Sequence, residues 1–307
     1  MGDPLELQLT PASAIPASHI PPQQRITLAR LIGALVLVAL SVVVQRDGWR
    51  DLTSIALHDE ESSHILLVPI IAAWLFWVRR ARLRNCRASF SFGGMLITGA
   101  GAAINYWGAS HGVQMSWHLG SVLMAVGCLI TVLGWDILVN FFPAFLSLLF
   151  LVPVPSTLRI ALSLPLMQFT AKAVENVMQI MGFAAQRSGN LLSINGVPVT
   201  VAEACNGLRM VFGLILVAAA FVFGTPMRLP IRLVTLLVSP FLAIFLNIVR
   251  LVPTMLVFGN ASRSTAEFFH DTSGWLMLPL AFLLLLGLHR FARWLCLPVL
   301  PYAVVYP

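Results

Sequence analysis

Eight apolar stretches, separated by short polar segments, recur along most of the chain. They lie at about 27–45, 64–78, 93–107, 117–135, 137–152, 205–224, 233–250 and 274–289. A bilayer core about 30 Å thick is crossed by about 20 apolar residues in an α-helix, because each residue adds about 1.5 Å. The pattern therefore predicts an all-α polytopic membrane protein with about eight transmembrane helices.

The segment between the fifth and sixth stretches, 153–204, is too long and too mixed to be a simple loop. Within it, 158–182 has apolar residues at helical spacing but also contains charged side chains, which favours a helix lying on the membrane interface. Two short apolar runs around Asn195-Gly196 then predict a β-hairpin. We expect these elements to form a small platform that leads the chain into the sixth helix.

Composition and charge support this class and suggest an orientation. The chain is 58% hydrophobic and 10% charged, whereas about a quarter of an average soluble chain is charged. Five arginines lie within 79–87. By the positive-inside rule this loop is cytoplasmic, which places both termini in the cytoplasm and 153–204 outside. The net charge of +7 thus reports topology in the inner (plasma) membrane, and we expect no nucleic-acid binding.

The pattern also suggests how the chain is divided. We expect residues 1–26 to be a disordered cytoplasmic tail, 27–297 a single transmembrane domain and 298–307 a short C-terminal tail. The first 26 residues lack the pattern of a cleaved signal peptide. Insertion is therefore expected to depend on the first apolar helix.

Cys205 is the first candidate for chemistry. Of the four cysteines, Cys86 and Cys296 are expected near the cytoplasm and Cys128 within the membrane, so Cys205 has no outer partner for a disulfide. It opens the sixth apolar stretch, and a helix N-terminus lowers the pKa of a nearby thiol. A buried cysteine that only fills space is the alternative. The polar neighbours Glu203, Asn206 and Arg209 favour a nucleophile.

A nucleophilic thiol needs a proton-transfer partner and a positive group. Five histidines are expected on the outer side, although a histidine in an outer loop is most often just solvated: His58, His64, His111, His118 and His270. Arg250 closes the seventh stretch, with Asn247 one turn before it on the same face. A charge at that depth indicates function unless the side chain extends to the headgroups.

Metal chemistry has weaker support. His58-Asp59-Glu60-Glu61 with His64 resembles a ligand cluster, but acidic outer loops are commonly only solvated. The chain contains no His-Glu-x-x-His motif. We expect neither a metal nor a cofactor.

Three short stretches, in order, resemble the exosortase/archaeosortase family of membrane transpeptidase-like enzymes, which process C-terminal sorting signals. They are Glu203-Ala204-Cys205-x-Gly207-Leu208-Arg209, Asn247-x-x-Arg250 and Phe269-His270-Asp271-x-x-Gly274-Trp275. The resemblance covers about 55–290. Asn206 departs from the family, in which serine most often follows the cysteine.

The resemblance implies roles for individual residues. Cys205 would be the nucleophile, Arg250 would stabilise the thiolate or oxyanion, and His270 would be the general acid and base. Supporting or substrate-binding roles would fall to Glu203, Asn206, Arg209, Asn247 and Asp271. If His270 faced away from Cys205, His64 or His118 would become the candidate base.

The resemblance also implies the partners. Substrates would be exported proteins that end in a Pro-Glu-Pro-like motif, a transmembrane helix and a basic cluster. The acceptor could be an amine of a lipid or glycan carrier, or water.

Two other functions remain open from the residues alone. A transporter would bind an anion through Arg209 and Arg250, but it should carry ionisable groups along several helices, and these helices have few. A non-catalytic assembly factor for polysaccharide or protein export is the second alternative.

Overall fold

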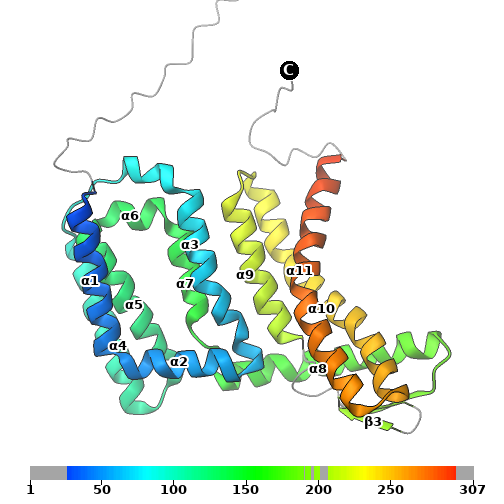
Figure 1. Cartoon of the computed structure of the whole chain (residues 1–307). Coiled ribbons are helices and arrows are strands. Elements are labelled where there is room, and N and C mark those ends of the chain that lie inside the picture. Colours follow the sequence, from blue (N-terminus) through cyan, green and yellow to red (C-terminus); the bar gives the residue numbers. More distant parts are fainter. Residues whose placement is uncertain (1–25, 190, 195–196, 201–206, 295–307) are drawn as a thin grey trace, which may run out of the picture.

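The computed structural model describes residues 26–189, 191–194, 197–200 and 207–294 as a set of helices with a small sheet at one end (Figure 1). The expected tails fall outside these residues, apart from Ile26. The elements in chain order are α1 (Leu28–Val44), α2 (Arg46–His58), η2 (Glu60–Leu67), α3 (Val68–Val78), η3 (Arg80–Asn85), α4 (Phe92–His111), α5 (Gln114–Leu133), α6 (Trp135–Asn140), α7 (Phe142–Leu148), η4 (Leu149–Leu151), α8 (Ser156–Ile180), β1 (Ala185–Ser188), β2 (Leu191–Ile194), β3 (Val197–Thr200), α9 (Leu208–Gly224), α10 (Leu229–Asn260) and α11 (Arg263–Trp294).

Several of these helices are suited to a membrane. Four are long and apolar enough to cross a bilayer, and six are if each of two bent helix pairs counts as one span. The expected number of eight spans is not confirmed. The helix α4 is long enough but rich in glycine, which lowers its hydropathy, and α9 is apolar but has only 17 residues. The protein is therefore a helical membrane protein with several apolar helices.

The first part of the chain contains an element that the sequence pattern did not predict. After α1 the chain bends by 82° into α2. In Figure 1, α2 runs across the lower end of the N-terminal helices. The helix α2 is short and polar, and it buries Gly48, Leu52 and Ala56 at four-residue spacing on one face. Because most of its other residues are polar, it does not register as an apolar stretch.

The helices α4 and α5 pack closely through glycines. Gly94, Gly101 and Gly108 lie seven residues apart on α4, and Gly120 and Gly127 repeat this spacing on α5. A Cβ atom on Gly108 would lie 2.3 Å from the backbone nitrogen of Trp117, so the two backbones approach more closely than larger residues would allow. The helix α1 packs against the α5 member of this pair.

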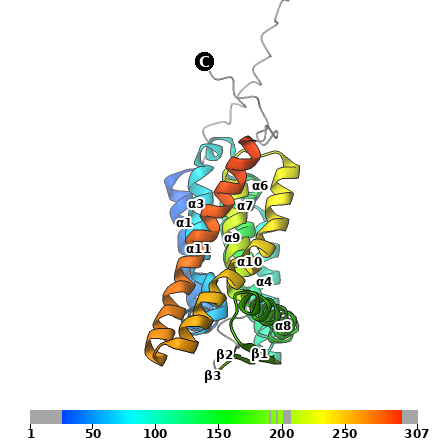
Figure 2. The ribbon, with the colours of Figure 1, turned by 90° about the vertical axis from the view of Figure 1, so that its right-hand side faces the viewer.

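The helix and hairpin expected for the platform are confirmed in outline, and the sheet has one strand more than expected. The chain bends by 86° between the α7–η4 segment and α8, and Figures 1 and 2 show α8 and the strands together at one end of the bundle. The strands β2 and β3 pair antiparallel, as the hairpin prediction requires, although Asn195 and Gly196 lie outside the described residues. The sheet has a third strand, β1, which was not predicted.

Two hydrophobic cores hold the C-terminal part together. One joins α9, α10 and α11 through residues such as Leu214, Leu246 and Leu285. The other joins α8 and the sheet to the later half of α10, where Leu251 and Met255 are fully buried. The helix α10 belongs to both cores, so its middle lies at the junction between the bundle and the platform.

Candidate active site

The expected nucleophile, Cys205, lies outside the described residues, together with Glu203 and Asn206. The surroundings of Cys205 are defined from Gly207 onward. The helix α9 begins at Leu208, later than expected, because its N-cap Gly207 has a φ of 72°. That left-handed conformation cannot continue a right-handed helix, and glycine adopts it at little cost. Cys205 therefore precedes α9, whereas we had expected it in the first turn.

Gly207 lies against the side chain of Asn247 on α10. A Cβ atom on Gly207 would lie 2.8 Å from Nδ2 of Asn247, closer than a carbon atom tolerates. Asn247 is fully buried. The segment that follows Cys205 therefore packs directly on the Asn247 amide, and only glycine fits there without a shift.

Arg250, one turn further along α10, is only 3% exposed. The helix does not end at Arg250 as expected but continues to Asn260, because apolar residues beyond Arg250 pack on the platform. Burial also excludes the alternative that the Arg250 side chain extends to the lipid headgroups. A buried guanidinium at the junction of two cores favours a functional or ion-paired role.

Arg209 from α9 approaches Arg250 at Gly274 of α11. A Cβ atom on Gly274 would lie 2.9 Å from Nη2 of Arg209 and 3.2 Å from Nη1 of Arg250. The two guanidinium groups are therefore neighbours in the space that the missing side chain leaves. Two adjacent cations favour a negative charge between or beside them, such as a thiolate or an oxyanion.

His270 lies on α11 one turn before Gly274, so the two share a helix face. We had expected His270 in the loop before the last helix, but α11 already begins at Arg263. Nδ1 of His270 is 3.2 Å from Oδ1 of Asp271, and the two side chains are 15% and 72% exposed. A carboxylate accepts hydrogen bonds, so this contact favours the tautomer with the proton on Nδ1.

The other histidines do not all behave as solvated loop residues. His118 is fully buried on α5, and its Nε2 lies 3.0 Å from Oδ2 of Asp51 on α2. His64 is buried on η2, where its ring stacks on Phe212 of α9 with centroids 5.3 Å apart. The expectation of solvation is wrong for both. His64 touches the helix that follows Cys205, whereas His118 packs between α5 and α2.

His58 and His111 are exposed, and the Nδ1 atom of each lies 3.0 Å from a backbone carbonyl of its own helix. They cap the ends of α2 and α4.

The acidic cluster has a structural partner. Nη1 of Arg159 on α8 lies 2.7 Å from Oδ2 of Asp59, and its Nε lies 3.3 Å from Oε2 of Glu61. These ion pairs connect the start of α8 to the turn between α2 and η2. Within the described part of the chain, no three His, Cys, Asp or Glu side chains are grouped as metal ligands.

Comparison with known families identifies the family of the chain. The family model of the transmembrane exosortases (Exosortase_EpsH) matches residues 49–287, which is most of the chain. The chain belongs to the transmembrane exosortase family. The match confirms the resemblance noted from the sequence, and it includes all three quoted stretches. No curated protein and no solved structure matches the chain.

In this exosortase, sequence reasoning named Arg209, Asn247 and Arg250 but missed the two glycines that let them approach. Gly207 and Gly274 both stand inside the stretches that carried the family resemblance. The signal was therefore present, but only the distances from each glycine to the polar side chains explain it.

Replacing Gly274 with alanine is expected to lower activity about 10- to 100-fold without unfolding the protein. The new methyl group must displace the Arg209 or Arg250 guanidinium, and misplacement by about 1 Å can cost about 100-fold in rate. Alanine also favours a helix over glycine. The measurement is cleavage of a tail-bearing reporter protein, with thermal unfolding in detergent recorded in parallel.

Gly287→Ala on the same helix is the matched control, because a Cβ atom there would meet nothing within 4 Å. Equal activity of the two variants would contradict the role assigned to the paired arginines.

Proposed function

We propose that the chain is a membrane-embedded cysteine transpeptidase or endopeptidase that cleaves C-terminal sorting signals of exported proteins. The observation that carries this proposal is the meeting of Arg209 and Arg250 at Gly274, beside the segment that follows Cys205. Membership of the exosortase family supports the same conclusion. A pair of neighbouring guanidinium groups, one of them buried, suits a reaction in which negative charge develops.

In the proposed mechanism, Nε2 of His270 first takes the proton of the Cys205 thiol. The resulting thiolate attacks the scissile carbonyl carbon and a C–S bond forms. Arg250 stabilises the thiolate before attack and the oxyanion afterwards. The C–N bond then breaks as Nε2 of His270 gives its proton to the departing amine, which leaves a thioester on Cys205. The acceptor nucleophile next loses its proton to His270 and attacks the thioester carbonyl carbon. The C–S bond breaks, so that the cleaved protein is bonded to the acceptor and Cys205 leaves as a thiolate.

The residues around this set have supporting roles in the proposal. Asn247 holds the turn at Gly207, and Asp271 orients the His270 ring. Arg209 adds a second positive group, and Glu203 and Asn206 flank the nucleophile. The substrate would lie beside the enzyme as one more helix, with its motif reaching the platform of α8 and the sheet. The acceptor would be an amine of a lipid or glycan carrier, or water.

The proposed location is the inner membrane, with the site on its outer side. The arginine-rich η3, the start of α1 and the end of α11 lie at one end of the molecule, and α8 and the sheet lie at the other (Figure 1). We expect a reporter enzyme that works only in the cytoplasm to be active when fused after Arg84 and inactive when fused at Gly189. The reverse result would put the platform in the cytoplasm and contradict the proposed side.

A thiol-labelling experiment tests the proposed nucleophile directly. Cys86 and Cys128 are 1% and 4% exposed, and burial raises the pKa of the Cys86 thiol, with Asp136 adding to the effect. A membrane-impermeant maleimide added to intact cells is therefore expected to label Cys205 and to stop processing of substrate tails.

Cys205→Ala protein should remain unlabelled under the same conditions. Label on that variant, or full processing after complete labelling of Cys205, would contradict the proposal.

A further inference from the structure

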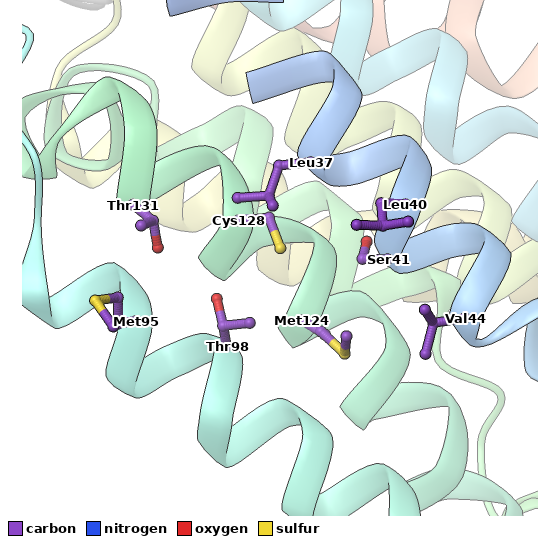
Figure 3. Close-up of a pocket in the computed structure, with 9 residues that line it drawn as sticks. All are labelled: Leu37, Leu40, Ser41, Val44, Met95, Thr98, Met124, Cys128 and Thr131. Carbon is purple, nitrogen blue, oxygen red and sulfur yellow. The ribbon is translucent and has the colours of Figure 1, made fainter. Parts of the chain in front are cut away.

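A groove lies between α1 and α4, far along the chain from the candidate active site. Both helices pack closely against α5 but make few contacts with each other, which leaves a cavity of about 300 Å³ (Figure 3). Met124, Cys128 and Thr131 of α5 form its floor. They lie four and three residues apart on one face of the helix, so the groove runs along the helix axis.

The polar groups inside this groove are already satisfied. The hydroxyls of Ser41, Thr98 and Thr131 donate to backbone carbonyls of their own helices over 2.7, 3.0 and 2.8 Å. The remaining lining is aliphatic or contains sulfur. No lining hydroxyl therefore requires a polar ligand, and hydrocarbon is the chemistry that fits.

The groove is open on a side that faces apolar surroundings. Leu40, Val44 and Met95 line it and are 57%, 68% and 46% exposed. In a membrane these rim residues meet acyl chains, since α1 belongs to a candidate span. The α1 wall extends from Leu37 to Val44, about 10 Å along the helix, in the direction in which acyl chains lie.

A buried polar atom marks the end of the groove where α1 bends into α2. Gln45 follows Val44 directly and is 9% exposed. Its Nε2 donates to Sδ of Met124 in the groove floor, while its Oε1 is buried without a hydrogen-bond partner in the described residues. The Gln45 amide therefore places a polar group beside this end of the otherwise apolar groove.

We propose that this groove binds one acyl chain of a membrane phospholipid, with the headgroup at the α1–α2 corner near Gln45. The lipid covers the groove along α5 and completes the packing between α1 and α4. This site is separate from the proposed catalytic residues and does not depend on their roles.

Photo-crosslinking tests the proposal on the full-length protein. The protein is placed in nanodiscs of phosphatidylethanolamine and phosphatidylglycerol that carry a diazirine on one acyl chain, and adducts are mapped by mass spectrometry. We expect adducts at Met95, Met124 and Cys128 to exceed those at Leu35 and Val36 several-fold. The last two residues are 64% and 62% exposed on α1 and do not line the groove. Equal labelling of both sets would indicate ordinary lipid contact and overturn the proposal.

Variants and a competition experiment separate the remaining outcomes. Leu40→Trp should fill the groove and lower the groove adducts several-fold, whereas Leu35→Trp, on the exposed face of the same helix, should leave them unchanged. Groove adducts that persist in Leu40→Trp would overturn the proposal. So would their loss when a substrate tail with its transmembrane helix is added, because the groove would then bind a polypeptide.

Native mass spectrometry of the wild-type protein supplies a measurement that needs no variant. One retained phospholipid per chain after extraction in mild detergent is the expected result. Protein that emerges with no lipid bound would count against the site.

Discussion

Cys205→Ala is expected to reduce cleavage of substrate tails by at least about 1,000-fold while the protein still inserts and folds. The loss follows because the thiolate supplies the bond that replaces the scissile amide, and removing a nucleophile costs several orders of magnitude. Cys205→Ser should be nearly as inactive, since a hydroxyl is barely ionised at neutral pH. The measurement is the ratio of cleaved to uncleaved reporter on an immunoblot, normalised to the amount of enzyme in the membrane.

Cys128→Ala provides the matched control for this variant. Cys128 is buried on α5 with the same side chain, but it faces the groove between α1 and α4. We expect it to retain most activity. Normal cleavage by Cys205→Ala would contradict the proposed cysteine chemistry.

Arg250→Lys is expected to lower cleavage about 100- to 1,000-fold, although the charge is kept. Loss of one donor to a developing oxyanion costs rates of this order. A lysine ammonium is a point charge, whereas the planar guanidinium presents several donors in fixed directions. Arg250 is 3% exposed beside Gly274 and Asn247, so a lysine there cannot take up another position in solvent. The variant should be compared by single-turnover cleavage in detergent, with unfolding followed by intrinsic fluorescence.

Arg263→Lys tests whether any arginine at this end of the bundle would give the same result. The Arg263 side chain is 90% exposed and pairs with Glu267 one turn along α11. Exposed pairs of this kind contribute little to stability, so activity should change less than about twofold. If both arginine variants lost activity equally, the effect of Arg250→Lys would not depend on the geometry at the site, and the proposed role of Arg250 would be contradicted.

Two other histidines, His64 and His118, are alternatives to His270 as the proposed base. His64 is buried and stacks on Phe212 of α9, the helix that follows Cys205 in the chain. His270 is favoured because it shares a face of α11 with Gly274, where both guanidinium groups meet, and because Asp271 orients its ring. His118 is a weaker alternative, since Asp51 already occupies its Nε2.

The sequence determined the class, the family and the residue types of the site. Long apolar stretches predict membrane helices because a buried backbone in lipid must satisfy its own hydrogen bonds. Local chemistry was also enough for the hairpin of β2 and β3, where two apolar runs flank Asn195-Gly196. These features depend on residues close together in the chain, so a linear pattern contains them.

Helix ends and polar helices were predicted less well. The apolar pattern stops near Arg250, but α10 continues to Asn260 because Leu251 and Met255 pack against α8 and the sheet. The helix α2 was missed because its buried face is narrow and its mean composition is polar. In both cases packing against a distant element decides the structure, and hydropathy along the chain does not record it.

Only the tertiary structure decided which polar residues meet. Arg209, Arg250 and Gly274 are far apart in sequence, and nothing in their spacing shows that two guanidinium groups share the space beside one glycine. The same holds for His118, which looked like a solvated loop residue and is buried against Asp51. Such contacts arise from the way α2, α5 and α9–α11 pack. The sequence by itself named the chemical groups, and the packing of helices determined which of them can act on one another.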